Sequence, residues 1–83
     1  MYTVMLLSSA QKEFDLLEKK YQDKVIESLR ALAEDPHSGK KLGGELDGQY
    51  SIKAWPYRVV YEIRKKQIIV VVLSIKHRKD AYR

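Results

Sequence analysis

Residues 50–83, YSIKAWPYRVVYEIRKKQIIVVVLSIKHRKDAYR, form the stretch that decides the fold. Apolar and polar side chains alternate along residues 50–54 and again along residues 57–63, which is typical of strands that bury one face. A Trp-Pro pair separates these two segments and predicts a turn. Residues 68–75 are apolar on both faces, as expected of a central strand that is covered on both sides. We therefore predict three consecutive strands followed by a basic tail.

The segment before this stretch predicts one more strand and two helices. Residues 2–7 are rich in β-forming side chains and predict the first strand. Apolar side chains then recur at helical spacing, so we expect a first helix over residues 8 to about 21 and a second helix over about 23–34. Residues 35–48 contain a proline and several glycines and predict a connecting loop. Both helices must bury their apolar stripes, and the sheet offers the surface for this.

These elements predict an α+β fold in the order β-α-α-β-β-β. We expect a small, mostly antiparallel four-stranded sheet with a helical hairpin packed on one face, and the first strand at the edge or beside the last. A chain of 83 residues holds one domain, residues 1–83, which buries roughly 60–65% of its unfolded surface.

Positive charge gathers in the part of the chain that carries the predicted strands. Residues 48–83 contain nine Lys and Arg against two acidic residues, a net charge of +7, whereas residues 1–47 contain seven against nine, a net charge of −2. Tyrosines alternate with these basic residues, and cations mixed with aromatic rings suit phosphates and stacked bases. The charge distribution therefore favours a polyanionic partner, which could be nucleic acid, a membrane surface or an acidic protein.

The composition excludes several other classes of protein. The chain has no Cys, which rules out disulfides and thiolate metal sites, and its two isolated histidines do not make a zinc site. We expect no metal and no other cofactor. The longest apolar run is far shorter than the ~20 residues of a membrane-spanning helix, so we expect a soluble, cytoplasmic protein.

Two cations are predicted to meet beside the turn between the first two of these strands. If those strands pair with their apolar residues on one face, Lys53 and Arg58 lie together on the other face. Like charges on paired strands are destabilising, so this arrangement makes sense if an anion normally sits between them. Alternatively, both side chains point into water while their stems cover the sheet. A short turn after the last strand would bring Arg78 and Tyr82 over the same area.

The order of elements, together with YRVVYEI at residues 57–63 and HRKDAYR at residues 77–83, resembles the RelE/ParE superfamily of toxins, and specifically its RelE branch. The resemblance covers nearly the whole chain. It implies a RelE-like fold and the toxin of a type II toxin-antitoxin system. It further implies a ribosome-dependent endoribonuclease that cleaves mRNA in the A site. The implied partners are the ribosome, mRNA and a cognate antitoxin that forms a hetero-oligomer with the toxin, and no membrane.

The resemblance also implies a catalytic group of four residues: Lys53, Arg58, Arg78 and Tyr82. Neighbouring positive charge favours the uncharged form of a lysine, so Lys53 is the candidate base and Arg58 the phosphate clamp. Arg78 would be a second clamp or the proton donor, and Tyr82 a stacking surface or an acid. The family carries a further lysine where this chain has Ser51. The other basic residues expected to contact RNA or the ribosome are Lys65, Lys66, Lys76, Lys79 and Arg83.

Two alternative functions stay open from the sequence. A ParE-like toxin would inhibit DNA gyrase by contact and without chemistry, and the tail arginine and tyrosine argue against it. A catalytically silent module would keep the fold and the basic face and bind RNA or protein only. The serine at position 51 is the feature that favours the silent module.

Overall fold

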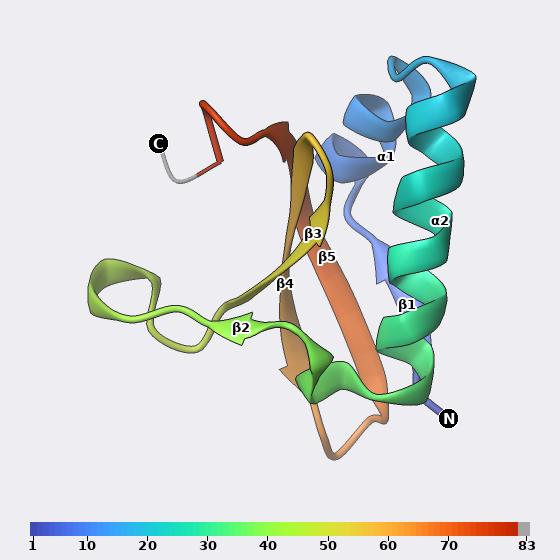
Figure 1. Cartoon of the computed structure of the whole chain (residues 1–83). Helices are drawn as coiled ribbons and strands as arrows, with labels where there is room; N and C mark the ends of the chain where they lie inside the picture. The colour runs from blue at the N-terminus through green and yellow to red at the C-terminus, as the bar shows by residue number, and fades with distance from the viewer. Residues whose placement is uncertain (82–83) are drawn as a thin grey trace.

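The computed structural model describes residues 1–81 and has two helices packed on one face of a five-stranded sheet (Figure 1). Its elements, in chain order, are β1 (Thr3–Leu6), α1 (Ser8–Asp15), α2 (Lys19–Glu34), the 3₁₀ turn η1 (Pro36–Ser38), β2 (Lys40–Lys41), the 3₁₀ turn η2 (Gly44–Leu46), β3 (Tyr50–Ala54), β4 (Tyr57–Arg64) and β5 (Ile69–His77). None of the helices among residues 1–81 has both the length and the apolar character needed to cross a membrane.

The strands lie in the order β1-β5-β4-β3-β2. β1 runs parallel to β5, and the other neighbours pair antiparallel. This confirms the mostly antiparallel sheet, the helical hairpin on one face, and the first strand at the edge beside the last. The prediction of four strands was wrong, because Lys40 and Lys41 pair with β3 as a fifth strand. The Leu42 N–H also donates to the Gln49 carbonyl at 2.9 Å, which extends this pairing into the loop.

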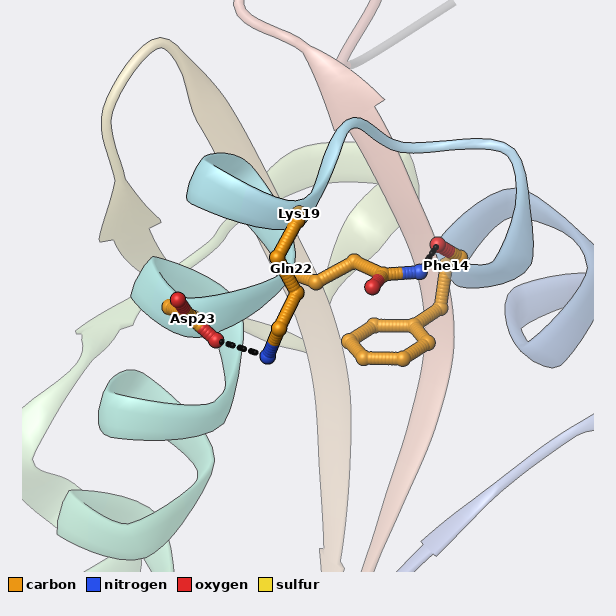
Figure 2. A network of polar contacts seen from close by, with 4 residues as sticks. All are labelled: Phe14, Lys19, Gln22 and Asp23. Carbon is orange, nitrogen blue, oxygen red and sulfur yellow. Dashed lines mark hydrogen bonds and ion pairs between the residues drawn. The ribbon is translucent and has the colours of Figure 1, made fainter.

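The link between the two helices lies earlier than predicted, since we expected the first helix to end near residue 21 and the second to begin near residue 23. α1 ends at Asp15 and α2 begins at Lys19, because the Glu18 carbonyl accepts hydrogen bonds from the first turn of α2. Figure 2 shows how the link is held. The Gln22 side-chain amide donates to the Phe14 carbonyl at 3.1 Å and so joins α2 to α1, while Lys19 pairs with Asp23 at 2.6 Å within α2. The periodicity of the apolar residues runs through the link, so it does not mark the boundary.

The core lies between the helices and the covered face of the sheet. Val25 and Leu32 of α2 are fully buried, as are Val59 of β4 and Val72 of β5. Tyr61 is also fully buried, and its hydroxyl donates to the Pro36 carbonyl at 2.7 Å, which ties η1 to the sheet. Burial raises the pKa of this hydroxyl above its ordinary value of 10.0.

A β-bulge in β5 changes which side chains face the helices. Val60 lies opposite Ser74 and Tyr61 opposite Val72, so Leu73 is an extra residue in β5. Before the bulge Val72 packs in the core, and after it Ile75 does. Because side chains alternate along a strand, the bulge turns the residues that flank Ile75 to the other face.

Candidate nucleic-acid interface

Three cations form a row across the sheet face that carries no helix, which we call the open face. Lys53 of β3 lies directly opposite Arg58 of β4, and Arg58 lies directly opposite Lys76 of β5. Their neighbours Ile52, Val59 and Ile75 pack in the core, so the three basic side chains point the other way. The strand register thus confirms the prediction that Lys53 and Arg58 lie together beside the hairpin turn. β5 adds a third cation.

The third cation of the row has a carboxylate partner. Glu13 of α1 reaches past the end of β1 to the free edge of β5. One of its oxygens accepts from the Ile75 N–H at 2.9 Å and the other lies 2.5 Å from Lys76 Nζ. The pair is partly shielded from water, with 40% of the Lys76 side chain and 25% of the Glu13 side chain exposed. The charge of Lys76 is therefore largely balanced within the protein.

The first residue of the tail stacks on the exposed tryptophan of the hairpin turn. The Arg78 guanidinium lies over the Trp55 ring, 4.9 Å from its centroid. The Arg78 N–H also donates to the Pro56 carbonyl at 2.8 Å, so the backbone holds the tail beside the turn. Trp55 is 56% exposed. The structure thus brings Arg78 to the same end of the sheet as Lys53 and Arg58. Trp55 is exposed and holds the Arg78 guanidinium in place there.

The open face is hollowed between two projecting segments. In Figure 1 the loop between β2 and β3 and the tail after β5 both extend away from the helices. Between them lies a hollow of about 510 Å³ whose lining includes Glu45 and Gln49 of the loop, Val60 and Ser74 of the sheet, and Ala81 of the tail. The row of cations borders this hollow through Lys76. Lys76 is the cation in the lining of this hollow, and Glu13 balances its charge.

Of the remaining predicted RNA contacts, the lysines of the β4–β5 turn lie apart from the row of cations. Lys65 and Lys66 lie in the turn between β4 and β5, at the far end of an eight-residue strand that spans roughly 20 Å. Lys79 is exposed just after β5, where its N–H donates to His77 Nδ1 at 3.3 Å. Tyr82 and Arg83 lie outside the described residues. The structure therefore brings together Lys53, Arg58 and Arg78 but not the lysines of the β4–β5 turn.

Sequence reasoning missed two residues of this region. Lys40 lies on β2 directly opposite Ser51, and a two-residue strand in a glycine-rich loop leaves no periodic signal. Glu13 contacts β5 from 62 and 63 residues away in the chain, and no local pattern predicts such a contact. Within residues 1–81, no three His, Cys, Asp or Glu side chains gather as they would around a metal ion.

Comparisons with known proteins agree with this geometry. A family model described as the ParE toxin of the type II toxin-antitoxin system parDE matches residues 4–82. Toxin RelG of Mycobacterium tuberculosis is 33% identical over 84 residues, which cover 99% of this chain and 97% of RelG. Toxin RelE of the same organism is 31% identical over 84 residues, which cover 99% of this chain and 87% of that toxin.

Solved structures show the same architecture. A chain of the toxin-antitoxin complex RelBE2 from Mycobacterium tuberculosis matches with a TM-score of 0.84 and 32% identity, covering 95% of this chain and 93% of that one. A chain of the intact Escherichia coli RelBE toxin-antitoxin complex matches with a TM-score of 0.81 and 23% identity, covering 93% and 96%, and shares the fold. The match along nearly the whole chain means that this protein belongs to the RelE/ParE superfamily of type II toxin-antitoxin toxins.

Proposed function

We propose that this toxin is a ribosome-dependent endoribonuclease that cleaves mRNA in the ribosomal A site and so inhibits translation in the cytoplasm. The observation that carries the proposal is the pair of cations, Lys53 and Arg58, directly opposite each other on the open face. Arg78 lies at the same end of the sheet. Like charges so placed are unfavourable unless an anion binds them, and a phosphodiester is such an anion.

The proposed mechanism uses the 2′-hydroxyl of the message as the nucleophile. A base removes the 2′-OH proton, the 2′-oxygen attacks phosphorus, and the bond to the 5′-oxygen breaks as an acid protonates that oxygen. We assign Lys53 as the base and Arg58 as the cation that stabilises charge on the phosphate. Arg78 is a second clamp or the proton donor, and Tyr82 keeps the stacking or acid role that the family resemblance gives it.

The histidines support a need for the ribosome. Both are engaged with tyrosine rings, His37 edge-on to Tyr50 and His77 edge-on to Tyr57. Tyr50 and Tyr57 pack on the covered face, and His77 lies directly opposite Tyr57, so these contacts do not place a pair of histidines at the cation row, as many ribonucleases use on free RNA. A site built from cations alone depends on an external scaffold to hold the message in line for attack, and we propose that the ribosome supplies it.

The decisive experiment adds the purified protein to translating ribosomes and maps the 5′ ends of the message by primer extension. We expect new ends within A-site codons and little cleavage of the same RNA without ribosomes. An intact message would overturn the proposal. A parallel gyrase supercoiling assay identifies the alternatives: inhibition of gyrase without message cuts indicates a ParE-like activity, and RNA binding without either indicates a silent module.

We also propose that an acidic or amphipathic segment of a cognate antitoxin binds this toxin, covering the basic face or displacing the tail. Two of the similar solved structures are complexes of a toxin with its antitoxin. Besides the row of cations, the open face carries exposed apolar side chains, Met5 on the edge strand β1 and Leu7 just after it. An amphipathic segment would match both.

Charge attraction sets a testable property of this association. Because the partner meets a chain segment with a net charge of +7, we expect the association rate to fall as ionic strength rises. Stopped-flow mixing of toxin and antitoxin at low and high salt measures it. A rate that is the same at both salt concentrations would contradict the proposed role of the basic face.

A further inference from the structure

The short strand β2 directs one of its two lysines to the open face. Lys40 lies directly opposite Ser51, and Ser51 faces the open side because its neighbours Tyr50 and Ile52 pack in the core. Residues that lie directly opposite in antiparallel strands project to the same face. Lys40 therefore projects to the open face, whereas Lys41, which lies opposite Tyr50, projects the other way.

One hollow joins this lysine to the paired cations. It has a volume of about 300 Å³, and its lining includes Lys40, Ser51, Lys53 and Arg58. The three cations come from three adjacent strands and surround a serine that is only 2% exposed. Because the side chain of Ser51 is small, it leaves room between the three cations for a group of the ligand. The hollow is therefore enclosed by positive charge contributed by β2, β3 and β4.

The cations on the two sides of Arg58 differ in their partners. On the β5 side, Lys76 is held by the carboxylate of Glu13. On the β2 side, no carboxylate of residues 1–81 forms an ion pair with Lys40, Lys53 or Arg58. Anion binding is favoured where charge is not already balanced, so the β2 side of the row attracts an anion more strongly than the β5 side.

We propose that this hollow binds a phosphate group of single-stranded RNA and that Lys40 is a phosphate-binding residue of the site. The inference rests on the proposed function, because it is continuity with Lys53 and Arg58 that selects RNA as the occupant. A phosphodiester presents two oxygens that share one negative charge, and the three cations that line the hollow can contact both. Lys40 thus adds a phosphate contact from β2. On the opposite side of Arg58, Glu13 pairs with Lys76 and balances its charge.

The test measures RNA binding as a function of salt. The probe is a short single-stranded RNA with methylated 2′-hydroxyls, which binds without being cleaved. Each phosphate contact on a single strand contributes about −0.7 to the slope of log K against log salt, so Lys40→Gln is expected to reduce the slope by about 0.7 and the affinity roughly five- to tenfold at about 50 mM salt. Lys40→Arg keeps the charge and is expected to restore both.

Two controls separate the position of a charge from the net charge of the protein. Lys41→Gln removes one charge from the neighbouring residue on the opposite face, and we expect the parental slope. The double variant Lys19→Gln with Asp23→Asn removes an ion pair within α2, keeps the net charge, and is also expected to keep the slope. Thermal unfolding of each variant shows that it is folded, and Lys40 and Lys41 are both at the surface, so folding should be unaffected.

The outcomes separate this inference from the proposed function. If Lys40→Gln and Lys41→Gln have equal slopes, Lys40 is not a phosphate-binding residue, even where the parent cuts mRNA on ribosomes. A Lys40→Gln variant that loses affinity for the antitoxin while keeping its RNA slope would assign the hollow to the antitoxin and overturn the inference. If the parent makes no cuts but the slopes differ as expected, the hollow binds RNA and only the proposed cleavage fails.

Discussion

The two faces of the sheet differ in what surrounds their side chains. On the covered face, the residues of β4 and β5 are buried against α1 and α2 and contribute stability through apolar burial, about 25 cal/mol for each Å². On the open face, the same strands carry Arg58 and Lys76 in one row with Lys53. The sheet therefore carries both core clusters on one face and the row of cations on the other. Cations that repel one another can collect on one face because the other face holds the fold together.

The largest effect on stability is expected from a truncation on the covered face. Leu32 is fully buried between α2 and the sheet, so Leu32→Ala is expected to lower the free energy of unfolding by about 2–5 kcal/mol, measured by denaturant titration. Met5→Ala on the open face, where the side chain is 51% exposed, should cost less than about 1 kcal/mol. Equal losses would break the distinction between the faces.

A smaller loss is expected where the loop before β2 touches the sheet. A Cβ atom added at Gly39 would overlap the Tyr61 hydroxyl and lie 2.7 Å from the Ser51 carbonyl oxygen. Gly39→Ala is therefore expected to lower the unfolding free energy by about 1–3 kcal/mol, by the same titration. Gly43→Ala is the control, since a Cβ there meets nothing within 4 Å and should be neutral or stabilising by at most about 1 kcal/mol. If Gly39→Ala left the unfolding free energy unchanged, that result would contradict the close contact of Gly39 with Tyr61 and Ser51.

Stability should also depend on pH through the buried tyrosine. Because burial raises the pKa of Tyr61, the folded protein holds this proton more tightly than the unfolded chain does. The resulting stabilisation is fully present below about pH 10 and is lost as pH rises through the folded pKa. Denaturation midpoints from about pH 9 to about pH 11 should fall for the parent and for Tyr2→Phe. The decline should be weaker in Tyr61→Phe, and an unchanged decline would show that other groups cause it.

The covered face could be predicted from the sequence because burial leaves a periodic pattern. Alternation in residues 50–54 and 57–63 indicates β3, β4 and the faces of their side chains, and the two-residue turn between them then places Lys53 opposite Arg58. The helical stripes indicate that both helices pack against the sheet. Local periodicity does not reveal the end of each helix, because the apolar spacing continues through the link at residues 16–18.

The open face was harder to predict because its geometry depends on irregular features. Residues 68–75 are apolar on both faces, so no pattern indicates the bulge at Leu73, and it is the bulge that turns Lys76 toward Arg58. The two residues of β2 give no periodic signal, although they bring Lys40 beside Ser51. The contact of Glu13 with β5 depends on tertiary packing alone. Charge content was therefore visible in the sequence, while the arrangement of the charges was not.

The most direct test of the account uses the smallest expected change in stability. Arg58→Ala removes a cation from between two others, so the unfolding free energy should change by no more than about 0.5 kcal/mol. Cleavage of mRNA on ribosomes should nevertheless fall by about 10²- to 10³-fold. Arg64→Ala is the matched control on the same strand, where the arginine instead pairs with Glu62 at 2.8 Å, and it should cleave at the parental rate. An Arg58→Ala protein that cuts at the parental rate, or that loses activity only because it unfolds, would contradict the separation of chemistry from stability.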